Sequence, residues 1–296
     1  MNDTLIIGGN GYVGSLLYSK INADSIDLCL YGKDLDYSQK INYNDADISS
    51  YKNIILLAGH SSVKMCEFNR KNAWVNNVDY FYNLCERLTP DQLLIYASSA
   101  SVYGIKGNIC KESDINLNPL NHYDFTKVTT DIIANKFISD GKNIIGLRFG
   151  TVNGYSKNIR SDLMINAMVH SYKTNGFIQS FNDWIKRPIL GTEDLVEAII
   201  TILESKKVYS GQYNLCSFNL TVFEIANTVS KILGCELKRN ENLSKEKVYD
   251  FEIDNSKFKN IYNFEFKQTI ESIAQSLIDT DLEVFSNRNT DSFIFS

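Results

Sequence analysis

The chain has 296 residues, of which 44% are hydrophobic and 22% are charged, and its formal net charge at pH 7 is −5. The length suffices for one large domain or two coupled ones, and the acidic balance argues against nucleic acid or an anionic membrane as a partner. No apolar run approaches the ~20 residues of a membrane span and no secretory signal is visible, so we expect a cytoplasmic protein.

The cysteines and histidines point to a reducing compartment and to no metal site. Six cysteines are scattered along the chain without C-x-x-C spacing, which is typical of free thiols. The three histidines form no cluster with them, so we expect no structural zinc.

Strand-like and helix-like patterns alternate in the first half of the chain. Apolar runs predict strands over residues 4–7, 26–31, 53–58, 93–97 and 144–149. Helical spacing of apolar residues predicts helices over 12–21, 72–88 and 123–139, the last with Gly141 near its C-cap. This alternation is typical of an α/β fold with a doubly wound parallel sheet of the Rossmann type.

The alternation weakens after about residue 150. Residues 151–160 are loop-like, Ser161 is expected to cap a helix ending near residue 175, and Thr192 is expected to cap another over 195–203. Thr221 and Glu224 fit a capping box before a helix that ends near Gly234. We therefore divide the chain into a Rossmann domain, residues 1–150, and a smaller α+β lobe, residues 151–296, some of whose elements pack back on the first domain.

The segment LIIGGNGYVG, residues 5–14, places three glycines between a strand and a helix. Gly8, Gly11 and Gly14 suit a tight turn, close backbone approach to a pyrophosphate and close packing of helix on strand, respectively. The pattern favours a dinucleotide at the helix N-terminus. The alternative is an ordinary glycine bend without a ligand.

The end of the second predicted strand bears on which dinucleotide binds. An acidic residue about 20 positions after the turn contacts the ribose hydroxyls in the NAD pattern. That place falls on residues 31–33, and no carboxylate occurs before Asp34. Lys33 could pair with a 2′-phosphate, which favours NADP. The alternative is that Asp34 reaches back to the ribose and the cofactor is NAD.

Tyr123 and Lys127 form a candidate catalytic pair. A spacing of four places both on one face of a helix, and a nearby ammonium favours the phenolate of a tyrosine that serves as acid or base. Ser98 and Ser99 follow a predicted parallel strand, where a hydroxyl could orient the substrate oxygen.

Nine segments extend this pattern along nearly the whole chain: IIGGNGYVG (6–14), ILLAG (55–59), NNVDYFYNL (76–84), YASSASVYG (96–104), NHYDFTK (121–127), LRFGTVNG (147–154), RPILGTEDL (187–195), GQYNL (211–215) and DNSKF (254–258). In this order and spacing the chain resembles the extended short-chain dehydrogenase/reductase family. That family includes NAD(P)-dependent nucleotide-sugar epimerases, dehydratases and ketoreductases.

The resemblance implies a role for each matched residue. Tyr123 would be the general acid/base, Lys127 its pKa partner and a ribose ligand, and Ser99 the catalytic hydroxyl. Together with Lys33, Tyr123 and Lys127, the cofactor contacts would be Gly8, Asn10, Gly11, Tyr12, Val13, Gly14, Leu57, Ala58, Gly59 and Asn77. The substrate contacts would be Ser99, Ser101, Thr151 and Arg187.

Arg187 matches an arginine that commonly contacts the nucleotide-sugar diphosphate, a task that suits a guanidinium. The alternative is a structural ion pair of Arg187 with Glu193 or Asp194. His60 and His122 could touch substrate, although a lone histidine is more often structural.

Departures from the family narrow the reaction. Residues 99–101 hold no acid, which disfavours a 4,6-dehydratase, and neither Cys110 nor His170 lies in the context of an epimerase/reductase Cys/His pair. Thr151 replaces an asparagine of many 4-epimerases.

We expect a nucleotide-sugar 4-ketoreductase that uses NADP, makes a deoxy or modified sugar for surface polysaccharide, and forms a homodimer through first-domain helices. A 4-epimerase with retained NAD, a reductase of other carbonyls, and a dinucleotide-binding sensor or scaffold remain alternatives.

Overall fold

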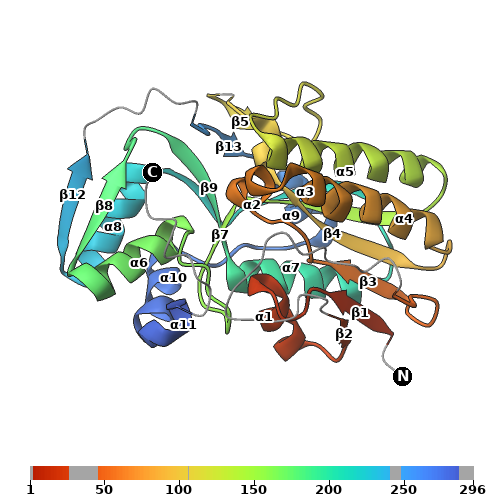
Figure 1. The fold of residues 1–296 in the computed structure, drawn as a ribbon, viewed down its shortest axis with the longest axis horizontal. Helices are drawn as coiled ribbons and strands as arrows, with labels where there is room; N and C mark the ends of the chain where they lie inside the picture. The colour runs from red at the N-terminus through yellow and green to blue at the C-terminus, as the bar shows by residue number, and fades with distance from the viewer. Residues whose placement is uncertain (1–2, 27–45, 106, 241–247, 287–296) are drawn as a thin grey trace.

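A six-stranded parallel sheet forms the centre of the computed structural model, which describes residues 3–26, 46–105, 107–240 and 248–286 (Figure 1). Its strand order is β10-β6-β4-β3-β1-β2, and every neighbouring pair is parallel. The strands are β1 (Thr4–Ile7), β2 (Asp24–Ile26), β3 (Asn53–Leu56), β4 (Leu93–Ser99), β6 (Asn143–Phe149) and β10 (Gly211–Leu215). The predicted doubly wound α/β fold is confirmed.

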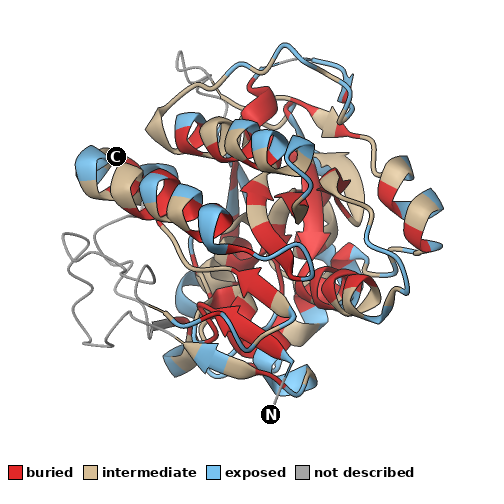
Figure 2. Ribbon diagram, turned by 90° about the vertical axis from the view of Figure 1, so that its right-hand side faces the viewer, coloured by how far each residue is buried: buried red, intermediate tan, exposed pale blue. Residues whose placement is uncertain are grey.

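Alternate side chains of the strands enter two hydrophobic cores, one on each face of the sheet. Ile6, Ile55 and Ile95 pack with residues of α1 (Tyr12–Lys20), α7 (Thr192–Glu204) and α9 (Ser256–Tyr262). The neighbouring Ile7, Ile54 and Leu94 pack with α4 (Tyr80–Arg87) and α5 (His122–Ser139) on the other face. Apart from the edge strand β2, the strands are consequently buried almost throughout (Figure 2), as expected for a parallel sheet covered on both sides.

A second lobe lies beside one end of this sheet, on the left in Figure 1, and has its own apolar core. It contains α6 (Met164–Asn175), β8 (Phe177–Phe181), α8 (Val222–Leu233), β12 (Glu236–Asn240), α10 (Ile270–Ile278) and α11 (Leu282–Ser286). A three-stranded sheet of β7 (Thr151–Asn153), β9 (Lys186–Gly191) and β11 (Phe218–Thr221) adjoins it. β5 (Ile109–Cys110) pairs with β13 (Glu252–Ile253). Although β10 and α7 belong to the second half of the sequence, they pack on the central sheet.

Two predicted helix caps are wrong because distant side chains do the capping. α6 begins at Met164, and its backbone N–H of Ile165 donates to Asn153 Oδ1 at 2.8 Å, so Ser161 is not its cap. α7 begins at Thr192 itself, and the N–H of Glu193 donates to Gln268 Oε1 at 2.9 Å. The side-chain amides of Asn153 and Gln268 come from distant parts of the chain. Their oxygens supply the hydrogen-bond acceptors that a local cap residue would otherwise provide.

Other boundaries differ less. The helix predicted over 72–88 begins earlier, with α2 (Val63–Phe68) before it, and comprises α3 (Arg70–Trp74), a π-helical turn over Val75–Asp79 and α4. Residues 151–160, which were predicted to be a loop, contain the strand β7. The capping box of α8 is confirmed. β2 runs from Asp24 to Ile26, and residues 27–31 of the predicted strand lie outside the described residues.

No helix in the described ranges is long and apolar enough to cross a membrane. The described cysteines are free thiols: Cys66, Cys85, Cys110, Cys216 and Cys235.

A buried ion pair fastens α5 to the sheet. Arg148 Nε of β6 donates to Asp131 Oδ2 of α5 at 2.8 Å, and the two side chains are only 5% and 2% exposed. Tyr96 of β4 donates its hydroxyl to the other oxygen of Asp131 at 2.8 Å, and Arg148 Nη1 donates to the Tyr103 hydroxyl at 2.8 Å. Each charge therefore has several partners in a region that water does not reach.

Loss of one member of this pair should be costly. We predict that Asp131→Ala lowers the free energy of unfolding by about 3–5 kcal/mol, because Arg148 is left as a buried unpaired charge. Lys136→Ala on the exposed side of α5 removes only a surface pair with Asp140 and should cost less than about 1 kcal/mol. Denaturant unfolding of both variants measures this, and equal small losses would contradict the account.

Candidate active site

The candidate site lies at the carboxyl ends of the central strands. β2 and β3 flank β1 on opposite sides, so a crevice is expected where the chain leaves these strands. The turn after β1 and the segment after β3 meet there, because the N–H groups of Leu57 and Ala58 donate to the carbonyl of Ile7 at 2.8 and 2.9 Å. The predicted cofactor contacts on these two segments are thus neighbours.

Two glycines of the turn have no room for a side chain. A Cβ on Gly14 would lie 2.0 Å from the carbonyl oxygen of Gly8. A Cβ on Gly8 would lie 2.6 Å from the N of Ala58, and the φ of Gly8, +101°, also disfavours any other residue. A Cβ on Gly11 would lie 3.2 Å from its nearest neighbour, so this position faces more open space.

The turn fits the pyrophosphate of a dinucleotide. α1 starts directly after Gly11, and its N-terminus has no side-chain cap, which leaves N–H groups and the positive helix end for a phosphate. Asn10 is exposed at the tip of the turn, and Val13 packs on the core behind it. Tyr12 points to the second lobe, where its hydroxyl donates to the carbonyl of Gly154 at 2.8 Å. Lys33 lies outside the described residues.

Asn77 connects the segment after β3 with α5. Its Oδ1 accepts the N–H of His60 at 2.9 Å, and its Nδ2 donates to the His60 carbonyl and to Thr126 Oγ1, both at 3.0 Å. A Cβ on Gly59 would lie 2.8 Å from Asn77 Oδ1. The Asn77 amide therefore fixes the chain at this edge of the crevice.

The two histidines singled out in the sequence have structural surroundings. The buried His60 ring lies with Nδ1 3.1 Å from Asn76 Nδ2. The Nε2 of His122 lies 2.9 Å from the carbonyl oxygen of Arg70, on the outer side of α5. We interpret both as structural residues.

The structure brings Ser99, Tyr123 and Lys127 together. Ser99 is the last residue of β4 and Tyr123 lies in the first turn of α5, and the Ser99 side chain is near enough to lower the pKa of Tyr123. Lys127 Nζ lies 5.8 Å from the centre of the Tyr123 ring and donates to the carbonyl of Ala97 at 2.7 Å. A hydroxyl, a phenol and an ammonium thus converge at the end of a parallel strand.

Burial dominates the electrostatics of this pair. It raises the pKa of Tyr123 to about 12, whereas the nearby Ser99 side chain and the positive charge of Arg160 both lower it. Burial also lowers the pKa of Lys127 to about 8. The ammonium of Lys127 donates to the Ala97 carbonyl, and the positive charge of Arg160 is the one that lowers the pKa of Tyr123 among the main causes of its shift.

Arg160 is a residue that the sequence reasoning missed. It belongs to a segment, residues 154–160, that contacts both sides of the crevice. Ser156 Oγ donates to the carbonyl of Tyr12 at 2.5 Å, and Arg160 Nη1 donates to the carbonyl of Ser61 at 3.1 Å. Arg160 lies 37 positions after Tyr123 and in no local motif, so only the fold reveals their proximity.

Arg187 and Thr151 are also neighbours. Arg187 Nη2 donates to Thr151 Oγ1 at 3.0 Å, and its guanidinium lies 5.6 Å from the centre of the Tyr249 ring. The buried Nε has no hydrogen-bond partner in the described part of the chain. Burial lowers the pKa of Arg187.

The alternative ion pair of Arg187 is not seen. Glu193 pairs with Lys20, and Asp194 accepts from Ser217 Oγ at 2.6 Å. Among the described residues Arg187 thus forms no ion pair, and a half-buried guanidinium whose enclosed Nε has no partner suits an anionic group such as a phosphate.

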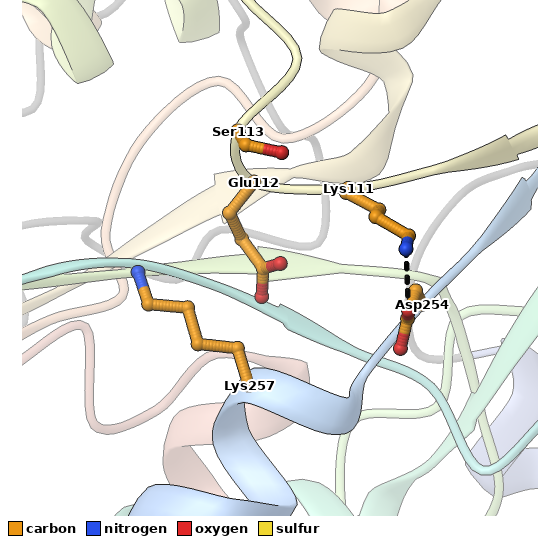
Figure 3. A pocket seen from close by; sticks show the side chains of 5 residues that line it. All are labelled: Lys111, Glu112, Ser113, Asp254 and Lys257. Carbon is orange, nitrogen blue, oxygen red and sulfur yellow. Dashed lines mark ion pairs between the residues drawn. The ribbon is translucent and has the colours of Figure 1, made fainter.

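A separate cavity of about 380 Å³ lies beside β10 and is lined by Lys111, Glu112, Ser113, Asp254 and Lys257 (Figure 3). Lys111 pairs with Asp254 at 3.7 Å. Glu112 Oε1 accepts the N–H of Asn214 at 2.8 Å, and Lys257 Nζ donates to the carbonyl of Gln212 at 2.8 Å. Since these contacts occupy backbone groups of the end strand, we interpret the cluster as closing the sheet edge rather than as the active site.

A family model described as "NAD dependent epimerase/dehydratase family" matches residues 4–216. An ADP-L-glycero-D-manno-heptose-6-epimerase from Brachyspira hyodysenteriae is 31% identical over 178 residues, which are 52% of this chain and 56% of the relative. UDP-glucuronate 4-epimerase 4 from Arabidopsis thaliana is 26% identical over 61% of this chain and 44% of the relative. The matches thus span about half the length of these relatives.

A longer match and the solved structures agree with the fold. A UDP-glucose 4-epimerase from Lactobacillus helveticus is 25% identical over 79% of this chain and 82% of its own length. MoeE5 in complex with UDP-glucuronic acid and NAD superposes with a TM-score of 0.80 at 19% identity, over 94% of this chain and 98% of that one. RMD from Pseudomonas aeruginosa, complexed with NADPH, superposes with a TM-score of 0.76 at 16% identity, over 94% and 98%.

Two alanine variants separate the packing role of the turn from its proposed binding role. We predict that Gly14→Ala lowers the free energy of unfolding by about 1–3 kcal/mol, because α1 must move away from the Gly8 carbonyl. Gly11→Ala should cost less in stability yet weaken dinucleotide binding, because the new methyl group faces the pyrophosphate. Denaturant unfolding and dinucleotide titration of both variants test this. Unchanged affinity in Gly11→Ala would argue against a phosphate at this turn.

Proposed function

Because the chain belongs to the NAD-dependent epimerase/dehydratase family of extended short-chain dehydrogenases/reductases, we propose that it is a nucleotide-sugar oxidoreductase. Its reaction would transfer a hydride between a nicotinamide dinucleotide and a hydroxyl-bearing carbon of the sugar. The observation that carries the proposal is the convergence of Ser99, Tyr123 and Lys127 at the end of β4, in the same parallel sheet whose β1 leads into the glycine turn.

Each residue of the cluster has a chemical task in this proposal. The dinucleotide, when bound, supplies the hydride acceptor or donor. Tyr123 exchanges the proton of the sugar hydroxyl, and the hydroxyl of Ser99 orients the reacting oxygen. Lys127, fixed by the Ala97 carbonyl, would hold the cofactor ribose. Because burial keeps Tyr123 protonated in the ligand-free protein, its activation needs additional positive charge, which Arg160 already supplies in part.

Arg187 supports a diphosphate-bearing substrate. Its guanidinium is held by Thr151 and the Tyr249 ring, and its Nε remains without a partner among the described residues. A nucleotide diphosphate placed there would satisfy that donor. This favours a nucleotide sugar over a carbonyl compound without phosphate.

We propose that the enzyme is a 4-ketoreductase that uses NADP, because residues 31–33 hold no carboxylate and Lys33 could pair with a 2′-phosphate. One observation favours a second candidate, a 4-epimerase with retained NAD. Segment 154–160 bonds to Tyr12 on one side of the crevice and to Ser61 on the other, which would slow release of a bound dinucleotide. Two of the relatives named above are 4-epimerases.

Tyr123→Phe tests the proposed chemistry. We predict a loss of kcat of about 100-fold or more, because the phenolic proton is removed, with dinucleotide affinity nearly unchanged. The assay uses NAD(P)(H) with UDP-glucose, UDP-glucuronic acid and a UDP-4-ketosugar.

Ser99→Ala and Ser98→Ala provide a matched pair for the same assay. Ser99→Ala should reduce kcat. Ser98→Ala should leave it intact, since the buried Ser98 hydroxyl is on the opposite face of β4 and has no hydrogen-bond partner within the described ranges. Full activity of Tyr123→Phe would contradict the proposal. A wild type that binds dinucleotide yet turns over none of these sugars would favour the sensor.

The cofactor choice has its own test. We predict that the wild type binds NADPH at least about tenfold more tightly than NADH, since a charge-assisted hydrogen bond contributes about 1.5–3 kcal/mol. Lys33→Ala should reduce this preference. Fluorescence titration with both dinucleotides measures it. Tighter binding of NADH would overturn the NADP assignment and favour the epimerase.

A further inference from the structure

Tyr249 connects two parts of the candidate site. Its ring lies against Arg187 of β9, with the guanidinium 5.6 Å from the ring centre. Its hydroxyl lies 2.9 Å from each carboxylate oxygen of Asp124, in the first turn of α5. One side chain thus contacts both the arginine proposed to hold the diphosphate and the helical turn that carries Tyr123.

Backbone contacts place the Tyr249 ring beside Arg187. Asp250 Oδ1 accepts the N–H of Lys186 at 2.9 Å, and the N–H of Phe251 donates to the carbonyl of Lys186 at 3.3 Å. The residues that follow Tyr249 are therefore bonded to the residue that precedes Arg187. An aromatic face within about 6 Å attracts a guanidinium, and the attraction is strongest where water is excluded.

The Tyr249 hydroxyl is bonded to the cap of α5. Asn121 Oδ1 accepts the N–H of Asp124 at 3.0 Å, and Asp124 Oδ2 accepts from Asn121 Nδ2 and from the N–H of Leu120, both at 3.0 Å. The hydroxyl donates to Asp124, which is fully buried, and accepts from Asn121 Nδ2. Since it is bonded to both residues of the cap, it is fixed to the turn in which Tyr123 lies.

The same contacts leave Arg187 available for an anion. Asp124 is satisfied by neutral donors, and within the described ranges neither Asp124 nor Arg187 forms an ion pair. Arg187 Nη2 donates to Thr151 Oγ1, whereas its enclosed Nε has no hydrogen-bond partner in the described part of the chain. The guanidinium is therefore held by a ring and a hydroxyl, and its charge is not neutralised by a carboxylate.

We propose that Tyr249 is a positioning residue, which holds Arg187, and through it the substrate diphosphate, at a fixed place relative to Tyr123. This inference rests on the proposed function, because it needs Arg187 to bind a diphosphate. The ring and the hydroxyl have separate tasks. The ring orients the guanidinium and so contributes to substrate affinity. The hydroxyl ties the ring to the cap of α5 and so contributes to the alignment of the sugar with Tyr123.

Tyr249→Leu tests the task of the ring. The probes are UDP and ADP, titrated against protein saturated with NAD(P), so that the dinucleotide occupies the turn after β1. We expect Tyr249→Leu to weaken binding of the tighter probe by about tenfold, because the guanidinium loses its aromatic support.

Tyr249→Phe tests the task of the hydroxyl. Because this variant keeps the ring, it should bind the nucleoside diphosphate within about threefold of wild type. Its kcat for the nucleotide sugar should still fall by about tenfold, because a small displacement of the sugar from Tyr123 is costly to the reaction. Restored affinity with lowered kcat is a split that a general loss of packing would not produce.

Two tyrosines outside the crevice provide matched controls. Tyr209 carries Lys207 Nζ 5.1 Å from its ring centre, so Tyr209→Leu removes a comparable cation contact. Tyr51 donates its hydroxyl to Asp24 Oδ2 at 2.9 Å, so Tyr51→Phe removes a comparable bond to a carboxylate. Both tyrosines precede the amino ends of strands, β10 and β3, and both variants should keep wild-type affinity and kcat.

A double-variant cycle tests whether Tyr249 acts through Arg187. Arg187→Ala should weaken binding of the nucleoside diphosphate at least as much as Tyr249→Leu does. The double variant should bind no more weakly than Arg187→Ala alone, because the ring then has no guanidinium to hold. If Tyr249 had only a structural role, the two losses would multiply.

The outcomes separate this inference from the function on which it rests. Wild-type affinity of Tyr249→Leu, or losses that multiply in the double variant, would overturn the inference while a weakened Arg187→Ala keeps the diphosphate at Arg187. Wild-type affinity of Arg187→Ala would overturn both. If Tyr249→Leu fails to fold, Tyr249→Phe decides, and a wild-type kcat of that variant would overturn the inference.

Discussion

The hydrogen bond from the Lys127 ammonium to the Ala97 carbonyl is the contact on which the candidate site depends. It joins the first turns of α5 to the end of β4 and so sets Tyr123 beside Ser99. Two further contacts hold the same helix: Arg148 with Asp131 toward the sheet, and Thr126 with Asn77 toward the segment after β3. Since α5 is fixed at three points, the phenol and the serine hydroxyl are held in register before any ligand binds, which is the preorganisation that proton transfer requires.

The charged side chains of the crevice lie around the fixed first turns of α5. Arg160 approaches Tyr123 from segment 154–160, whereas Arg187 lies on β9 against Tyr249. Asp124, next to Tyr123 in the chain, accepts the Tyr249 hydroxyl at 2.9 Å. Tyr249 thus contacts both the arginine proposed to hold the diphosphate and the carboxylate next to the proposed acid/base.

The sequence predicted the parts of this structure that local patterns encode. The central strands of the first half and the order of Gly8, Ser99, Tyr123 and Lys127 follow from apolar runs, glycine spacing and the resemblance to a known family. The caps of α6 and α7 did not, because Asn153 and Gln268 reach them from distant segments. Arg160 was missed for the same reason, because a lone arginine in a loop normally indicates a solvated residue. Only tertiary packing shows that it lies near Tyr123.

The central claim is that a sugar hydroxyl reacts at Tyr123 while its diphosphate lies at Arg187. A crystal structure of the protein with NAD(P) and a UDP-sugar tests this most directly. The account predicts the dinucleotide pyrophosphate at the N-terminus of α1, a sugar oxygen within about 3.2 Å of both Tyr123 Oη and Ser99 Oγ, and the diphosphate in contact with Arg187. A dinucleotide bound elsewhere, or a sugar that contacts neither hydroxyl, would contradict it.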